Sequence, residues 1–343
     1  MAAQSATSLT PGHIHIQHEL LLGGFQMFSG RVRLSTAAPE EPILVHLLPH
    51  DRALLGANSH FAQRLWRATA AALPHVHPAL AIVAMEGPSS WGRRGGVLSP
   101  QTSGLDLYQI CQRHGAWPTS VALEVAAQIA ETIAAAAAIP GGRCPAHGQL
   151  EASSVLLNAQ GTLTVMEYAF RPAPQVRGQC VLMFEPPRVL SPEHLLEQAP
   201  TDDRYALGLL LLELLNGSPP HAELTNSELI KRSLARPSQA ALVTQAIDAL
   251  HKEPAPPIAD ILRELLAFDP ADRPEPASVP DRLRAPIAEE PGPSIAEWAG
   301  RVDLSPTGHH PLDIGGKARA FHLLARPEDT QRSTDSPPAV APS

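Results

Sequence analysis

Apolar and polar residues alternate over much of the first hundred residues, as they do in strands that bury one face. The expected strands are residues 13–16, 25–28, 31–34, 43–48, 78–85 and 97–98. One helix is expected at 59–73, where Pro74 ends it, and a loop is expected at 87–96. This order predicts a twisted antiparallel sheet with one helix.

The pattern becomes helical in the second third of the chain. The alanine-rich stretch 119–139 predicts a long helix that has Thr119 or Ser120 as its N-cap and ends at Pro140. Residues 202–216 are almost wholly apolar, which predicts a helix buried on all sides.

Proline, serine and glycine predominate near the C-terminus, so residues 286–343 are expected to be a mostly disordered tail. Three apolar islands interrupt this tail: Ile295 with Trp298, Leu312 with Ile314, and Phe321 with residues 323–324. Such islands either fold onto a groove, in this chain or in a partner, or are only solvated apolar residues.

The composition is that of a globular protein, with 343 residues, 44% hydrophobic, 17% charged and a net charge of −8. No basic run is present and aromatic residues are scarce, so no nucleic-acid partner is expected. No apolar stretch is long enough to predict a membrane span, and the N-terminus lacks the pattern of a signal peptide. The three cysteines, Cys111, Cys144 and Cys180, are too few and too scattered for a disulfide framework, which favours reduced thiols and a cytoplasmic location.

Five motifs follow one another between residues 147 and 274. They are HGQLEASSVLL at 147–157, LTVMEYA at 163–169, LSPE at 190–193, TDDRYALGLLLLELLNGSPP at 201–220 and LLAFDPADRP at 265–274. In order and spacing they resemble the protein kinase catalytic loop (HRDLKxxN), the strand that ends in DFG, the APE motif, the F-helix and the late DPxxRP motif. The bias towards alanine, arginine and proline suggests a GC-rich, bacterial source.

The resemblance implies an α+β fold of the two-lobed protein kinase type. A small antiparallel β N-lobe with one helix is expected at 11–100, after a disordered N-terminus at 1–10. A larger, mainly helical C-lobe is expected at 101–285, before the tail at 286–343.

The positions that carry out phosphoryl transfer in kinases hold other residue types here. The degenerate positions are His46 for the lysine of the third strand, Gln149, Glu151 and Ser154 for the Asp, Lys and Asn of the catalytic loop, and Glu167 for the Asp of DFG. A shifted alignment cannot restore them, because no lysine precedes Lys231 and no aspartate lies between Asp106 and Asp202.

The glycine-rich loop is also degenerate. Gly23 and Gly24 match its glycines, but Gln26 stands where another glycine is expected, and the segment is equally typical of a simple β-turn. No cofactor is therefore expected. ATP with Mg²⁺ stays open only through Glu167, a single weak metal-ligand candidate.

Residues that stabilise the kinase fold are retained. The resemblance implies a buried ion pair between Glu193 and Arg273, and it implies that Asp203 holds the backbone of the catalytic loop. We therefore expect a pseudokinase, a protein-binding, scaffolding or regulatory module of a bacterial cytoplasm. The alternative is an atypical kinase or other ATP-dependent phosphoryl or nucleotidyl transferase, with Arg31 or Arg33 in place of the lysine and Glu167 on the metal.

Overall fold

The computed structural model describes residues 13–22, 25–33, 39, 41–47, 73–76, 81–86, 93–100, 102, 104–139, 147, 150–166, 191–192, 202–250, 254–289, 291–304, 310–311 and 320–323. These residues form a mixed α+β structure that divides into two compact units. Unit 1 comprises residues 1–64, 78–102 and 307–343, and unit 2 comprises residues 65–77 and 103–306.

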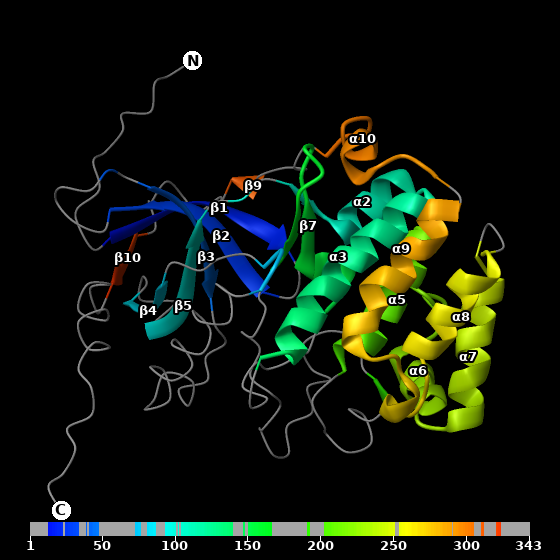
Figure 1. Ribbon diagram of the computed structural model, residues 1–343. Coiled ribbons are helices and arrows are strands. Elements are labelled where there is room, and N and C mark those ends of the chain that lie inside the picture. Colours follow the sequence, from blue (N-terminus) through cyan, green and yellow to red (C-terminus); the bar gives the residue numbers. More distant parts are fainter. Residues whose placement is uncertain are drawn as a thin grey trace, which may run out of the picture. The chain divides into compact units, whose positions relative to one another are not determined.

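Unit 1 is a seven-stranded antiparallel sheet with the order β10-β4-β5-β3-β2-β1-β9 (Figure 1). Its strands are β1 (His13–Leu22), β2 (Phe25–Val32), β3 (Glu41–Leu47), β4 (Ala81–Glu86), β5 (Arg93–Pro100), β9 (His310–Pro311) and β10 (Ala320–Leu323). Because β10 pairs with β1 as well as with β4, six of the strands close into a ring.

The predicted antiparallel sheet is present, but three details of the prediction are wrong. The strand expected at 13–16 continues to Leu22 as β1. The separate strands expected at 25–28 and 31–34 are one strand, β2, which runs through Ser29 and Gly30. Both residues are paired on each side, with β1 and with β3. This pairing keeps the dipeptide extended, although its residue types are typical of a turn. The loop expected at 87–96 is shorter, because β5 begins at Arg93.

Only the last residue of the helix expected at 59–73 lies within the described residues. That residue, Leu73, is buried in unit 2. The segment that follows is fixed there by two hydrogen bonds: Thr132 Oγ1 donates to the carbonyl of Pro74 at 2.7 Å, and the amide of Val165 donates to the carbonyl of His75 at 2.7 Å. Residues 73–76 are therefore part of unit 2 although residues before and after them belong to unit 1.

Unit 2 is mainly helical (Figure 1). A three-stranded sheet has the order β6-β7-β8 and consists of β6 (Leu105–Asp106), β7 (Val155–Leu157) and β8 (Leu163–Val165). The described α-helices are α2 (Leu107–His114), α3 (Thr119–Ala137), α5 (Asp203–Asn216), α6 (Asn226–Ser233), α7 (Arg236–Asp248), α8 (Pro256–Leu265), α9 (Val279–Glu289) and α10 (Ile295–Ala299).

Helix α5 lies in the core of unit 2, as its apolar sequence predicts. Side chains on all of its faces are buried, so it has no solvent-facing stripe. It begins at the N-cap Asp202, whose carboxylate accepts a hydrogen bond from the amide of Arg204, and it ends at Gly217. Gly217 has φ 75°, a left-handed conformation that glycine adopts without steric cost.

Helix α3 is the other long core element, but its predicted cap is wrong. The N-cap is Pro118, whose carbonyl accepts from Val121 and Ala122, while the hydroxyl of Ser120 donates to the carbonyl of Pro293 at 3.0 Å. Among the described residues α3 alone is long and apolar enough to cross a membrane, and 67% of that stretch is buried inside the unit. It is thus a core helix.

The prediction of a mostly disordered tail from residue 286 is wrong for its first part. Helix α9 continues through Pro286 to Glu289, with Leu283 and Pro286 buried, and packs along α3. Residues 291–304, here called the C-terminal strap, contain α10, which is capped by reciprocal hydrogen bonds between Ser294 and Glu297.

The strap is held by apolar contacts that its composition does not reveal. Trp298 is 9% exposed and lies against Trp117, with ring centroids 4.3 Å apart. Ile295 and Leu304 are also buried, and the side chains of residues 113 and 114 both donate to the carbonyl of Asp303. The strap is therefore part of unit 2, whereas the island at 320–323 is strand β10 of unit 1. The island at Leu312 and Ile314 lies outside the described residues.

Candidate functional site

The segment that resembles the kinase catalytic loop begins with a buried histidine, His147. His147 is fully buried, and its backbone amide donates to Asp203 Oδ2 at 2.7 Å. Its ring Nε2 lies 2.9 Å from the carbonyl oxygen of Met166, which can only accept, so Nε2 carries the proton. His147 thereby joins the start of α5 to the residue that follows β8. The resemblance implies that Asp203 holds the backbone of this loop; the bond from the His147 amide is compatible with that role, which stays a prediction.

The turn before β7 uses its polar groups internally. The hydroxyl of Ser154 accepts from the amide of Glu151 at 3.0 Å and donates to the carbonyl of the same residue at 2.8 Å. The carboxylate of Glu151 accepts from the hydroxyl of Ser153 at 2.6 Å. Ser154 is buried and Glu151 is half-buried, so both side chains stabilise a 3-10 turn at Ala152–Ser154. These contacts give Glu151 and Ser154 a structural role.

A carboxyl that the motif analysis did not single out lies next to this turn. Asp106 is 2% exposed and is the N-cap of α2, where its oxygens accept from the backbone amide and the side-chain amide of Gln109 at 2.7 and 2.6 Å. Burial raises the pKa of Asp106 to about 6, and the negative charge of Glu151 adds to the rise. The hydrogen bonds from Gln109 oppose that rise only in part.

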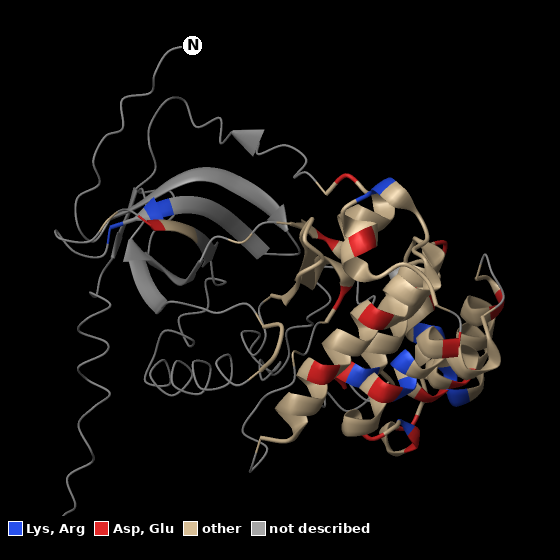
Figure 2. Cartoon of the chain, turned by 45° about the horizontal axis from the view of Figure 1, so that its top comes forward, with Lys and Arg blue, Asp and Glu red and all other residues tan. Residues whose placement is uncertain are grey.

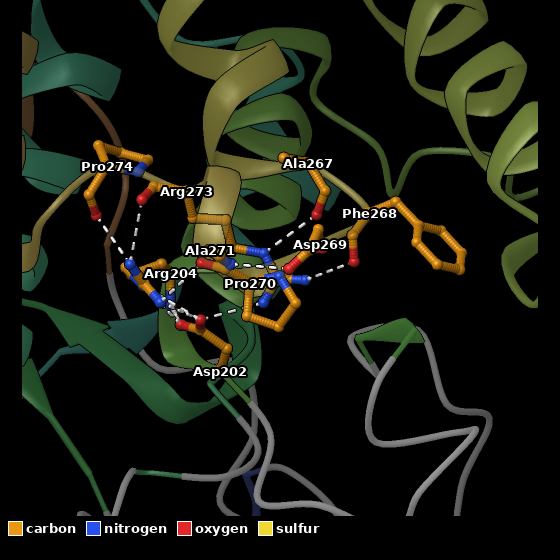
Figure 3. Close-up of polar contacts among 9 residues, drawn as sticks. All are labelled: Asp202, Arg204, Ala267, Phe268, Asp269, Pro270, Ala271, Arg273 and Pro274. Carbon is orange, nitrogen blue, oxygen red and sulfur yellow. Dashed lines mark hydrogen bonds and ion pairs between the residues drawn. The ribbon is translucent and has the colours of Figure 1, made fainter.

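A second group of polar contacts connects the start of α5 to the segment 267–274 (Figure 3). Arg204 donates to both oxygens of Asp202, with Nη2 to Oδ2 at 2.6 Å and Nε to Oδ1 at 3.0 Å. Its remaining donor capacity is used on backbone carbonyls, the shortest contact being Nη1 to Pro274 O at 2.9 Å. Arg204 therefore fixes the path of a loop that is distant in the sequence.

Arg273 occupies the centre of this group. Its side chain is 0% exposed, and Nη1 lies 3.0 Å from Oδ2 of Asp202. Nε donates to the carbonyl of Ala267 at 3.0 Å, and the guanidinium lies 5.0 Å from the ring centroid of Tyr205. Such a buried cation is tolerated because its donors meet a carboxylate, backbone carbonyls and an aromatic face.

Asp202 is the shared anion of the two arginines. Burial alone raises the pKa of Asp202, but the hydrogen bonds and charge of Arg204, with the charge of Arg273, outweigh it and hold that pKa below its usual range. The ionised carboxylate is therefore the form that the folded chain stabilises.

The predicted site residues are only partly within the described chain. Gly23, Gly24, Gln149, Glu167 and Glu193 lie outside the described residues, so their expected roles stay predictions.

Two other predicted positions are described by backbone pairing alone. His46 is in β3, opposite Met27 and Val97, and Gln26 is in β2, opposite Leu21. Leu22 pairs with Phe25, so β1 and β2 are joined by the two residues 23 and 24, a hairpin that suits both a glycine loop and a simple turn.

The sequence analysis missed Asp202, Arg204 and Asp106. Asp202 and Asp106 stand directly before helices, which is an N-cap signal that the sequence does contain. The pairing of Arg204 with Asp202 is local, but its contacts with the carbonyls of residues 270–274 have no local signal.

Metal and thiol chemistry find no support in the described part of the chain. No group of three or more His, Cys, Asp or Glu side chains is placed there to hold a metal ion. Burial raises the pKa of Cys111 to about 12, so this thiol is not an activated nucleophile.

The charges of unit 2 are mixed in sign. Figure 2 shows acidic and basic residues interspersed over its helices. Several form pairs, as where Arg284 of α9 contacts Glu124 at 2.9 Å and Glu131 at 2.7 Å on α3, and Glu131 also contacts His75 at 3.1 Å.

Comparison with known proteins adds no assignment. No protein-family model matches the sequence, and no curated protein matches it significantly.

Proposed function

We propose that this chain is a pseudokinase: a protein kinase-like module that binds a protein partner and does not transfer phosphate. Unit 2 would correspond to the helical C-lobe and the sheet of unit 1 to the N-lobe. The five motifs at 147–274 carry the proposal, and the described contacts that support it are those of the residues assigned to the scaffold.

The observation that supports it best is the division of roles around His147. Asp203 is bonded to the His147 backbone, as expected of a residue that fixes the loop. By contrast, Glu151 and Ser154, at the positions of the catalytic Lys and Asn, are bonded to their own turn. A chain selected for its scaffold keeps the first kind of contact and is free to lose the reactive groups.

Nucleotide binding is the test, because the transferase alternative requires it. A ligand at one hundred times its dissociation constant adds about 2.7 kcal/mol of stability, equivalent to about 5 to 10 °C for a unit of this size. With millimolar ATP and Mg²⁺, we expect the melting temperature of the full chain to change by less than 1 °C, close to the error of a thermal-shift measurement.

Glu167→Ala is the informative variant, and Glu223→Ala, which removes an exposed carboxylate of unit 2, is its matched control. A Mg²⁺-dependent rise of several degrees that Glu167→Ala abolishes and Glu223→Ala preserves would establish the transferase alternative. A rise that neither variant affects would indicate a nucleotide site elsewhere.

We further propose that the module acts in a bacterial cytoplasm through a protein partner. Capture of proteins from the source organism by the full chain, followed by mass spectrometry, identifies the partner. The proposal then requires that the purified partner binds the full chain directly in the absence of nucleotide.

A further inference from the structure

The loop between α5 and α6 contains a histidine in a backbone conformation that few side chains adopt. His221 has φ 57°, in the left-handed region that a Cβ atom disfavours. Its carbonyl accepts from the amide of Leu224 at 3.0 Å, which closes a tight turn shortly before Thr225, the N-cap of α6. The side chain of His221 is only 11% exposed. The turn therefore directs an imidazole into unit 2 immediately before a helix begins.

The ring of His221 connects this loop to α7. It donates a hydrogen bond to the backbone of Leu242, a residue of α7 whose side chain is buried. Helix α6 packs against α7 (Figure 1), and among the described side chains of α6 only Ser233 is buried. A helix with so little buried surface opens locally at a fraction of the free energy of global unfolding. The contact of His221 with Leu242 therefore helps to hold the start of α6 in place.

The surroundings of the ring favour its neutral form. Within the described residues, the charged groups that act on it are Glu223 of the same loop and Arg232 of α6, while α7 contributes the backbone of Leu242. Oε1 of Glu223 lies 3.8 Å from Nδ1 of His221, but the Glu223 side chain is 73% exposed, so water screens its attraction for a protonated ring. Burial outweighs that attraction and lowers the pKa of His221 below its usual range, and the positive charge of Arg232 acts in the same direction.

We propose that His221 is a pH-sensitive latch, which holds the loop before α6 on α7 while its ring is neutral and releases it when the ring takes up a proton. A protonated imidazole is more stable in water than in this buried position, so proton uptake favours the open loop. Opening also relieves the left-handed backbone conformation. This inference goes beyond the proposed function and does not depend on it.

The direction of the pH effect follows from the same arrangement. In the open loop the ring is solvated and titrates near the ordinary histidine pKa of about 6.5. In the closed loop the pKa is lower, so the closed form is fully favoured above about pH 6.5 and loses that advantage as the pH falls below it. The equilibrium between the two forms changes by at most about tenfold for each pH unit.

Amide hydrogen exchange of the full chain, measured by mass spectrometry at pH 5.5, 6.5 and 7.5 and corrected for the intrinsic exchange rate, tests the latch. We expect the protection of residues 221–234 to fall several-fold from pH 7.5 to pH 5.5, while the protection of α5 stays constant. Glu228, which caps α6 together with Thr225, does not contribute to this change, because hydrogen bonds from Thr225 lower its pKa and it stays ionised over this range. In His221→Asn the ring is absent while asparagine tolerates the left-handed conformation, so the pH dependence should disappear.

His75→Asn is the matched control, because His75 is the other described residue besides glycine with a left-handed backbone, at φ 58°, and its ring contacts Glu131 of α3. This variant should keep the pH response of α6. His221→Gly, which adopts the left-handed conformation without strain, must lose the response as well, so the test remains decisive if His221→Asn fails to fold. Constant protection of residues 221–234 in the parent chain, or an equal fall in the His221 variants, would overturn the latch. Loss of the response in His75→Asn would also overturn it, because the titrating group would then lie elsewhere.

Discussion

The buried carboxyl of Asp106 allows a quantitative prediction. Asp106 is 2% exposed, and a rise of its pKa from 3.8 to about 6 corresponds to a cost of about 3 kcal/mol for keeping it ionised in the folded chain. Asp106→Asn removes that charge and keeps the shape of the side chain. Asparagine is also a good N-cap, so the bond from the backbone amide of Gln109 is retained. The side-chain amide of Gln109 must turn over, so that its oxygen accepts from Nδ2 of the asparagine.

The variant is expected to be more stable than the parent at pH 8. The variant also loses the favourable interaction of a negative charge with the N-terminus of α2, which is worth up to about 1 kcal/mol. Subtracting this from the roughly 3 kcal/mol leaves a net increase of about 2 kcal/mol in the free energy of unfolding. For a unit of this size that gain raises the melting temperature by about 4 to 8 °C.

The gain has a defined pH dependence. Because the folded-state pKa of Asp106 is raised, the folded chain holds a proton between about pH 4 and pH 6 that the unfolded chain has released. The contribution of Asp106 to stability is therefore full at low pH and is lost as the pH rises through about 6. The difference between variant and parent should accordingly be small near pH 4 and reach its full value above pH 7.

Urea unfolding followed by circular dichroism at pH 4.5, 6 and 8 measures this difference. Groups whose pKa is lowered, such as Asp202 and Glu264, titrate in both proteins and cancel in the comparison. Asp248→Asn, which removes an exposed carboxylate, is the control and should show no such trend. If Asp106→Asn unfolds at the same urea concentration as the parent at pH 8, or at a lower one, then ionised Asp106 does not destabilise the folded chain as proposed.

Three further predictions concern packing in unit 2. Arg273→Ala leaves Asp202 without its fully buried partner and should lower the free energy of unfolding in urea by about 3 to 5 kcal/mol. A decrease below about 1 kcal/mol would show that Arg273 does not stabilise the fold in this way. Gly208→Ala places a methyl group 2.8 Å from Cγ of Leu266 and should lower stability by about 1 to 3 kcal/mol; an unchanged melting temperature would show that α5 has room there. A chain that ends after Ala285 cuts α9 and removes the strap, so it should melt well below a chain that ends after residue 304, and equal melting of the two would contradict the packing of the strap.

The sequence predicts best those elements whose signals are local. Helix α5 follows from an almost wholly apolar run with acidic residues before it and glycine after it. The hairpin of β1 and β2 follows from alternation around residues 23 and 24. The contact of Asp203 with the loop at His147 has no local signal, and only the motif at residues 201–220 predicts it.

Other features depend on contacts between distant segments. The strap has the composition of a disordered tail, and its order rests on the contact of Trp298 with Trp117. Arg204 fixes the distant loop through the carbonyls of residues 270–274, so no window around Arg204 predicts that part of its role. Ser29 and Gly30 have turn propensity, which pairing on both sides overrides.

The closure of the sheet by β10 has a consequence for how the protein is made. The ribosome releases β1 to β5 first, then all of the segment 103–306, and only then the strand that fills the gap between β1 and β4. At usual rates of synthesis, roughly 10 to 40 s pass between residue 102 and residue 320. During that interval the nascent chain carries two uncovered strand edges while the helical unit is able to fold. Release of β10 therefore sets the time at which the edges of β1 and β4 are first covered by the chain's own strand.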